Sequence, residues 1–239
     1  MRHLLATVTL GPLLLLQGRY VRRVTPRLPE PPGERQGEVG NGPPLRLLIL
    51  GDSAAAGVGA ATQAEALSGQ LVAALSRQFR VQWRLTAKTG STTLETLEHL
   101  RGKPREPFDV VVTSLGVNDV TSNRSPAAWL QHKAQLLTLL QQEYGARLVL
   151  LSGLPPMHRF PALPQPLRWY LGSQARRYNA ALAGLVASQP GCRLASVAAP
   201  AAGEGLIASD GFHPGPAFYR LWAESLAETI HQCWPQRPA

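Results

Sequence analysis

Short apolar runs alternate with longer stretches of helical periodicity from Leu45 toward the C-terminus. The runs at residues 45–50 and 109–115 are almost continuously apolar, which is typical of strands buried on both faces of a sheet. Between such runs, apolar residues recur every three or four positions, as they do in amphipathic helices. Regular alternation of strands and helices predicts an α/β fold in which helices cover both faces of a parallel sheet.

The expected elements follow one another without an internal repeat. One helix is marked at its start, since Pro126 stands in its first turn. The apolar stripe of that helix is expected to face the core, and it consists of Trp129, Leu136, Leu137 and Leu140. We expect strands at residues 45–50, 81–87, 109–115, 147–151 and 192–197, and helices at residues 62–79, 92–100, 125–144, 168–188 and 216–233.

Composition is consistent with one such domain and an N-terminal extension. The 239 residues are 44% hydrophobic and 16% charged, which is enough for a substantial core. The net charge of +9 comes mostly from arginines spread along the chain, and without zinc-finger spacing or an RNA-binding aromatic motif we expect no nucleic-acid partner. Two cysteines, Cys192 and Cys233, are too few and too far apart for a disulfide framework or a zinc site. No two histidines have metal-ligand spacing, and we expect no metal and no cofactor. The oligomeric state is left open.

The first 24 residues differ from the rest in composition. Residues 4–16 form an apolar run of signal-peptide length, shorter than the roughly 20 residues that span a bilayer. Three interpretations stay open: a membrane anchor or monotopic helix, an uncleaved or atypical signal, and an amphiphilic appendage. An arginine cluster follows the run and consists of Arg19, Arg22, Arg23 and Arg27.

Arginines on the C-terminal side of the run favour a membrane-associated protein whose body is cytoplasmic, in a bacterial cell, with a periplasmic body as the alternative. Contact with a membrane surface through this segment is therefore an expectation. Residues 25–44 are rich in Pro, Gly and Glu and predict a flexible linker. The expected organisation is an apolar segment at residues 1–24, a linker at 25–44 and a catalytic domain at 45–235.

Small and polar residues gather where the predicted strands end. In sheets of this kind, ligands bind beyond the carboxyl ends of the strands. We therefore expect the chemistry of the protein at this edge. The segments concerned are residues 51–57, 88–92, 116–119 and 152–156, together with the turn at residues 209–214 before the last helix.

The residue types at this edge match the needs of acyl transfer by a serine. Such chemistry requires a hydroxyl, a base, a group that orients the base, and donors for an oxyanion. Ser53 follows a strand and precedes a helix, and Asp210 and His213 are three residues apart, a spacing that brings both side chains to one face of a turn. The Asn118 amide and the Gly90 N–H are candidate oxyanion donors.

Taken in order, these residues resemble the SGNH (GDSL-type) serine hydrolases. The first block alone is a weak signal, whereas four blocks in order are a strong one. The similarity covers about residues 45–232, and the chain looks most similar to small bacterial lipase- or esterase-like members. Ala54 stands where the family usually has Leu, a departure that leaves the chemistry intact. The blocks are Gly51-Asp52-Ser53, Gly90, Gly116-Val117-Asn118-Asp119 and Asp210-Gly211-Phe212-His213.

The resemblance implies a triad of Ser53, Asp210 and His213, and an oxyanion hole made by the N–H groups of Ser53 and Gly90 and the amide of Asn118. It also implies a flavodoxin-like, three-layer αβα sandwich with five parallel strands, the SGNH hydrolase fold. The expected activity is hydrolysis of small carboxylic esters through an acyl-enzyme on Ser53. Acyl transfer to a sugar, lipid or thiol acceptor is the alternative, and a non-catalytic membrane-tethered binding module is a further one.

Two features near the motif residues have structural interpretations. Asp52 and Asp119 are expected to hold loops through hydrogen bonds to the backbone. The proline-rich segment at residues 155–166 is open to two interpretations: a loop that covers the core, or a semi-rigid apolar wall of the substrate pocket.

Overall fold

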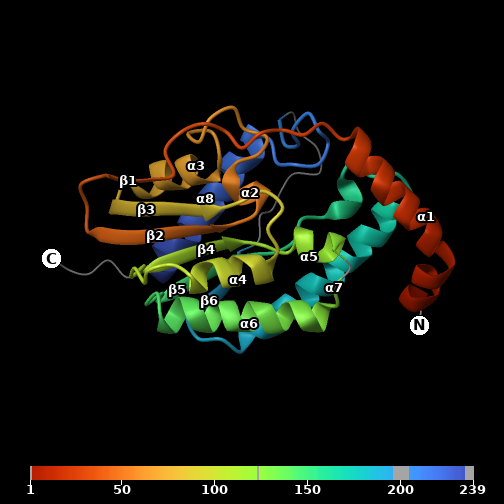
Figure 1. The fold of residues 1–239 in the computed structure, drawn as a ribbon. Coiled ribbons are helices and arrows are strands. Elements are labelled where there is room, and N and C mark those ends of the chain that lie inside the picture. Colours follow the sequence, from red (N-terminus) through yellow and green to blue (C-terminus); the bar gives the residue numbers. More distant parts are fainter. Residues whose placement is uncertain (1, 123, 196–204, 235–239) are drawn as a thin grey trace.

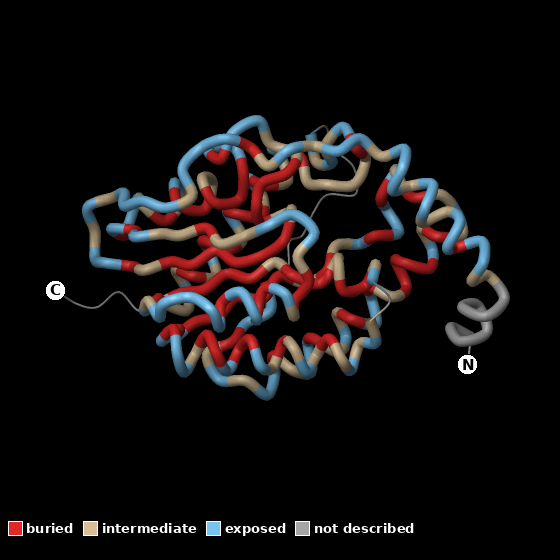
Figure 2. Tube along the Cα trace, in the orientation of Figure 1, coloured by how far each residue is buried: buried red, intermediate tan, exposed pale blue. Residues whose placement is uncertain are grey.

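Strand β2 (Pro44–Gly51) is buried along nearly its whole length in the computed structural model, which describes residues 2–122, 124–195 and 205–234. Its side chains alternate between two hydrophobic clusters, as the pleat requires. Leu48 and Leu50 belong to one cluster, and Leu47 and Ile49 belong to the other. Because both faces are apolar, both must be covered by helices, and Figure 2 shows buried residues along the central strands and on parts of the surrounding helices.

The sheet has six strands in the order β1-β3-β2-β4-β5-β6 (Figure 1). Five of them are parallel, as expected, and the sixth, β1, is an antiparallel edge strand that the sequence did not predict. The five parallel strands have the flavodoxin-like order, in which the chain reverses its direction of travel between β2 and β4. The other strands are β1 (Gln36–Val39), β3 (Arg80–Ala87), β4 (Val110–Ser114), β5 (Leu148–Ser152) and β6 (Cys192–Ala195).

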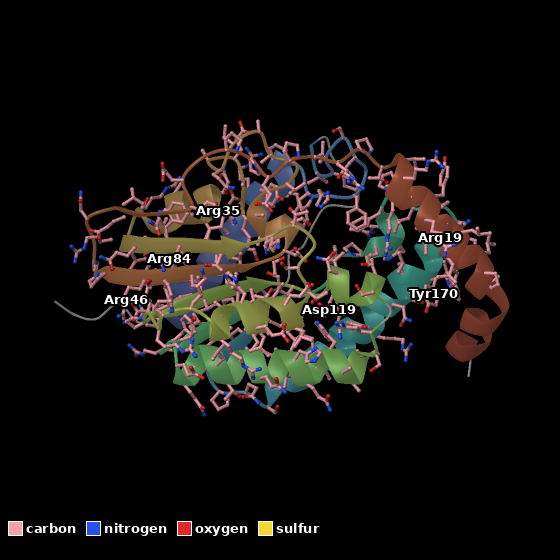
Figure 3. All side chains as sticks on the ribbon, in the orientation of Figure 1. Arg19, Arg35, Arg46, Arg84, Asp119 and Tyr170 are labelled. Carbon is pink, nitrogen blue, oxygen red and sulfur yellow. The ribbon has the colours of Figure 1, made fainter. Side chains whose placement is uncertain are left out.

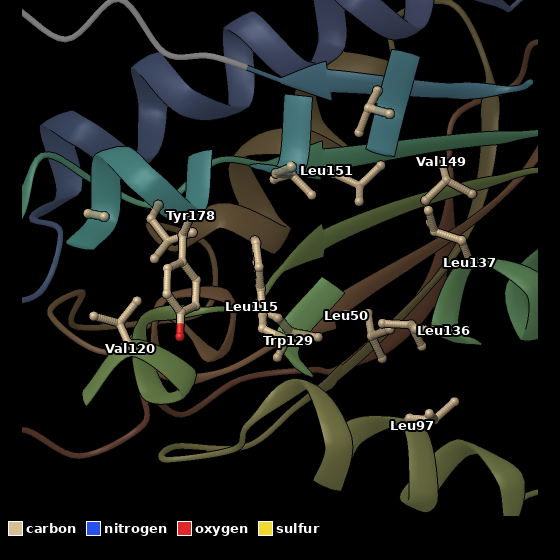
Figure 4. Close-up of a cluster of buried hydrophobic side chains, with 14 of the residues drawn as sticks. Leu50, Leu97, Leu115, Val120, Trp129, Leu136, Leu137, Val149, Leu151 and Tyr178 are labelled. Atoms are coloured by element: carbon tan, nitrogen blue, oxygen red, sulfur yellow. The ribbon is translucent and has the colours of Figure 1, made fainter. Parts of the chain in front are cut away.

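Helices form a layer on each face of the sheet, which makes the three-layer αβα sandwich (Figure 1). Helices α3 (Leu67–Leu75) and α8 (Pro216–Cys233) cover one face. Helices α4 (Thr93–Arg101), α6 (Pro126–Gln142) and α7 (Leu167–Ala187) cover the other, where the predicted α6 stripe packs around Trp129 (Figure 4). The remaining helical elements are α1 (Arg2–Val24), α2 (Ser53–Ala56), α5 (Val117–Thr121) and η1 (Met157–Arg159).

The prediction of a linker at residues 25–44 is wrong for part of that segment. Residues Gln36–Val39 pair with β3 along the edge of the sheet. Their side chains are all exposed, so the strand is held by backbone hydrogen bonds and leaves no hydrophobic pattern in the sequence. Helix α3 is also shorter than the predicted 62–79, and the last two residues of the strand predicted at 192–197 lie outside the described residues.

Helix α1 packs against the body of the protein. Its Leu14 side chain is buried, and Val21 packs against the cluster that fills the α7 side of the sheet. Within the described parts of the chain, no helix combines the length and the apolar character needed to cross a membrane.

Candidate active site

Ser53 is the first residue of α2, immediately beyond the carboxyl end of β2. The carboxylate of Asp52 accepts a hydrogen bond from the N–H of Ala54 at 3.1 Å and so caps this short helix. Glycine is needed just before it, because a Cβ on Gly51 would lie 2.4 Å from the backbone oxygen of Ser114 on β4. The tight approach of β2 to β4 therefore fixes where the Ser53 hydroxyl stands.

The turn before α8 brings Asp210 and His213 to this hydroxyl. One oxygen of Asp210 accepts hydrogen bonds from the N–H groups of Phe212 and His213, each at 3.0 Å, and these bonds define the turn. The other oxygen lies 2.5 Å from Nδ1 of His213, whose Nε2 lies 2.9 Å from Oγ of Ser53. Three residues that are up to 160 positions apart thus form one continuous hydrogen-bonded chain.

The local electrostatics favour an ionised Asp210. Burial raises its pKa, but the hydrogen bonds from the ring and N–H of His213 and from the N–H of Phe212 lower it further, so the net pKa lies below the usual value. An ionised carboxylate against Nδ1 selects the tautomer that carries its proton there. Nε2 is then free to accept the proton of Ser53. The His213 side chain is 19% exposed whereas that of Asp210 is 1% exposed, so solvent reaches the base and not the acid.

Asn118 joins the loops that follow three strands. Its side-chain nitrogen donates a hydrogen bond to the backbone oxygen of Ser91 at 2.9 Å and lies 3.5 Å from the carboxylate of Asp52. The amide therefore stands between the residue that precedes Ser53 and the loop that contains Gly90. Gly90 has φ of +85°, and the space where a Cβ would stand is open, so nothing shields its backbone from an approaching ligand.

The loop that carries Gly90 is braced from the N-terminal segment. Glu30 accepts hydrogen bonds from both the N–H and the hydroxyl of Thr89, each at 2.7 Å, and it forms an ion pair with Arg35. Burial raises the pKa of Glu30, but these hydrogen bonds hold it below its usual value. The segment predicted as a linker thus supports a candidate oxyanion loop, which composition alone did not indicate.

Beneath the site, Asp119 ties α5 to α4. One of its oxygens accepts hydrogen bonds from the N–H and the hydroxyl of Thr93 at 3.0 and 2.9 Å, and the same hydroxyl accepts one from the Trp129 indole at 3.1 Å. With the cap made by Asp52, this confirms that both aspartates hold loop backbone. Each of them also adjoins a candidate site residue in the sequence, Ser53 or Asn118.

Lys133 completes a buried charged cluster that the sequence analysis missed. Its side chain is fully buried, with Nζ 5.4 Å from the centre of the Trp129 ring. Among the described residues, neither Nζ nor the second oxygen of Asp119 has a hydrogen-bond partner. Burial lowers the pKa of Lys133 to about 8 and, with repulsion from Asp119, raises that of Asp52 to about 7. The sequence signal that could have indicated this cluster is a lysine within an otherwise apolar stripe of a predicted helix.

The proline-rich segment at residues 155–166 covers the core and also supports the catalytic turn. Met157 is fully buried. The Phe160 ring packs 4.9 Å from that of Phe212, which in turn meets the His213 ring edge-on at 5.3 Å. The first interpretation of the segment, a loop that covers the core, is therefore confirmed, and a role as a wall of the substrate pocket stays a prediction.

Several known proteins that resemble this chain are described as esterases or lipolytic proteins. The model of the GDSL-like lipase/acylhydrolase family matches residues 49–221. A GDSL-like esterase of Mycobacterium tuberculosis is 29% identical over 236 residues, covering 90% of this chain and 74% of that protein. A lipolytic protein of the G-D-S-L family from Veillonella parvula has a TM-score of 0.62 at 15% identity, covering 78% of this chain and 98% of its own.

A psychrotrophic esterase from Pseudoalteromonas, in a structure inhibited by monoethylphosphonate, has a TM-score of 0.59 at 18% identity and covers 78% of this chain and 97% of its own. At these identities the two solved structures establish the fold, and the family match adds the class of chemistry.

Proposed function

Since the chain belongs to the GDSL-like lipase/acylhydrolase family, we propose that it hydrolyses carboxylic esters through an acyl-enzyme on Ser53. The observation that carries this proposal is the hydrogen-bonded chain from Ser53 through His213 to Asp210, with contacts of 2.9 and 2.5 Å. Such a chain activates a hydroxyl that is otherwise a weak nucleophile at neutral pH.

In the first step, Oγ of Ser53 attacks the ester carbonyl while Nε2 of His213 takes the hydroxyl proton. Asp210 stabilises the imidazolium that forms and keeps the ring oriented through Nδ1. The tetrahedral intermediate then collapses, the bond to the alcohol oxygen breaks, and His213 returns its proton to the leaving alcohol. Water adds to the acyl-enzyme by the same route and releases the acid.

Negative charge on the carbonyl oxygen is held by the N–H of Ser53, the N–H of Gly90 and the amide of Asn118. Ser53 opens α2, so its N–H has no acceptor inside the helix. Gly90 presents bare backbone, and Asn118 is already held beside both loops by Ser91 and Asp52. The three residues follow strands β2, β3 and β4, at the edge of the sheet where the strand order reverses, which is where ligands bind in this fold class.

A fluorophosphonate probe tests the nucleophile, because it labels only an activated serine. We expect one label on the parent chain and none on Ser53→Ala. Hydrolysis of p-nitrophenyl acetate should fall by about 10⁴- to 10⁶-fold in Ser53→Ala and in His213→Ala. Ser188→Ala is the matched control, since that exposed hydroxyl donates to the backbone of its own helix end, and it should label and hydrolyse as the parent does.

If Ser53→Ala hydrolyses the ester as fast as the parent, the assignment of the nucleophile is wrong. A parent chain that folds but takes no label would favour the non-catalytic binding module instead. Product analysis with a competing alcohol separates hydrolysis from transfer, since a transferase would yield mainly the new ester.

A further inference from the structure

Helix α1 is held on the body in one fixed orientation. The Gln17 side chain donates to the backbone oxygen of Gln165 at 2.7 Å and accepts from the N–H of Leu167 at 3.0 Å, so it caps the start of α7. Leu14 and Val21 pack against the core on the same side of the helix. The opposite side of α1 therefore always faces outward.

Between the packed side and the outward side, α1 carries a row of large apolar side chains, which we call the α1 stripe: Leu13, Leu16, Tyr20 and Val24. Steps of three and four residues place them on one face of the helix. They are between 44% and 61% exposed, although a soluble surface usually carries such residues singly. An exposed apolar row of this kind is typical of a surface that contacts another molecule.

Positive charge borders the stripe on its outward side. The arginine cluster of Arg19, Arg22, Arg23 and Arg27 lies on or just after α1, and its side chains are exposed (Figure 3 labels Arg19). Within the described part of the chain, none of the four is in an ion pair, and the sequence has no Asp or Glu before Glu30. An apolar face bordered by unpaired arginines complements a surface that is apolar below and anionic above, which is the interface of a bilayer with anionic lipids.

Hydrogen bonds link α1 to segments that flank the candidate active site. Gln165, which binds Gln17, belongs to the proline-rich segment, whose Ala162 N–H bonds to the backbone oxygen of Gly211 in the catalytic turn at 3.2 Å. On the other side of the site, the Arg22 side chain reaches the backbone oxygen of Thr121, in the same short helix as Asn118, at 3.5 Å. Helix α1 thus connects to both sides of the site, at the end of the molecule where α5 and α7 lie (Figure 1).

We propose that the α1 stripe and the arginine cluster dock the protein on a bilayer surface that carries anionic headgroups, so that esters dissolved in the bilayer are taken up at the Ser53 site. The first half of this proposal concerns binding and stands alone. The second half, the class of substrate, rests on the proposed function.

Sedimentation with sucrose-loaded vesicles tests the binding. The parent should bind vesicles of phosphatidylcholine with 30% phosphatidylglycerol and bind pure phosphatidylcholine far more weakly. Arg19→Gln/Arg23→Gln should weaken partitioning onto the anionic vesicles by about 20-fold. Leu16→Ser/Tyr20→Ser should weaken it by at least about tenfold on the same vesicles.

Control variants remove positive charge or an exposed apolar side chain at positions outside α1. Arg77→Gln/Arg220→Gln removes equal charge from exposed positions outside α1, and Val39→Ser removes an exposed apolar side chain from β1. Both should bind vesicles within about threefold of the parent. Equal weakening by the arginine control would reduce the effect to net charge and overturn the proposed site. Parent binding that is equal on both lipid mixtures, or absent from both, would overturn it as well.

Two further readouts separate this proposal from others. Ser53→Ala should bind vesicles like the parent, so loss of catalysis and loss of docking are distinguishable. All α1 variants should hydrolyse p-nitrophenyl acetate in buffer at the parental rate, while a p-nitrophenyl dodecanoate held in anionic vesicles should be cleaved at least about fivefold more slowly by Arg19→Gln/Arg23→Gln. If the stripe instead joined two copies of the chain, light scattering without lipid would give a dimer that Leu16→Ser/Tyr20→Ser dissociates, and that result would overturn lipid docking.

Discussion

Two clusters of ionisable side chains lie at the same end of the sheet. They differ in how completely their charged groups are hydrogen-bonded and paired. In the catalytic turn, Asp210 has every oxygen in a hydrogen bond and pairs directly with His213. In the buried cluster, Asp119 and Lys133 share a charge environment without direct contact, and within the described residues each leaves one polar atom unpaired.

The pKa values follow this difference. Hydrogen bonds outweigh burial at Asp210 and lower its pKa, whereas burial prevails at Asp52 and raises its pKa to about 7. The comparison teaches that a buried carboxylate stays ionised when backbone N–H groups surround it, and that a distant lysine is a weaker substitute. The Asp210–His213 cluster is therefore suited to catalysis. The cluster of Asp52, Asp119 and Lys133 contributes to the electrostatic potential at the site.

Breaking the paired cluster should have the largest effect. Asp210→Asn keeps the size of the side chain but removes the charge that fixes the His213 tautomer, so we expect kcat for p-nitrophenyl acetate to fall by about 10⁴-fold. Asp109→Asn is the control, because that carboxylate is also paired, with Arg46, but at the opposite end of the sheet (Figure 3). A comparable loss in both variants would mean that damage to the fold, rather than the tautomer, explains the result.

Asn118 stands between the two clusters, since its amide approaches Asp52 and belongs to the proposed oxyanion hole. Asn118→Ala should lower kcat by about 10²- to 10³-fold with a smaller change in KM, because the oxyanion exists only after attack. Asn179→Ala also removes an amide that bridges backbone groups, at Leu154, and should cost less than about tenfold. Equal kcat losses in the two variants would argue against the oxyanion role.

Lys133→Met tests whether the buried positive charge of Lys133 contributes to catalysis. Methionine keeps most of the volume but leaves Asp52 and Asp119 without a nearby cation, and the added negative potential opposes a developing oxyanion. We expect kcat to fall by about tenfold at unchanged KM, measured on variants whose circular dichroism matches the parent. Lys103→Met, the same change at an exposed position, should leave kcat as it is. An unchanged kcat in Lys133→Met would show that the buried cluster is only structural.

A separate prediction concerns stability and its pH dependence. The pKa of Asp52 rises from 3.8 to about 7 on folding, so between these values the folded state binds more protons than the unfolded state. The contribution of Asp52 to stability therefore falls as the pH rises from about 4 to 7 and is constant above that. Asp52→Asn keeps the acceptor that caps α2 and does not titrate. Urea unfolding should show the variant gaining relative to the parent between pH 4.5 and 7.5, and a constant difference would contradict the raised pKa.

Much of the fold could be predicted from the sequence because its signals are local. The strands β2, β4 and β5 are short apolar runs, and the predicted bounds of α8, 216–233, match the structure. The turn that holds Asp210 and His213 depends on hydrogen bonds over two and three residues, so a spacing in the sequence was sufficient to bring these two side chains together.

Features that depend on distant contacts could not be predicted in this way. Glu30 and Thr89 are 59 residues apart, and nothing in either segment points to the other. Strand β1 pairs through its backbone and has exposed side chains, so it has no hydrophobic period. Lys133 was recognisable only as an exception within a stripe, and its importance depends on Asp52 and Asp119, which come from two other loops.

The support that Glu30 gives to the Gly90 loop has a practical consequence for where this enzyme can be shortened. Composition suggests that the catalytic unit starts at Leu45, but a chain cut there would lose both the edge strand and the carboxylate that holds Thr89. A shortened chain that keeps these contacts has to begin before Glu30. Removing α1 alone, by contrast, would test the proposed membrane docking separately from the proposed catalysis.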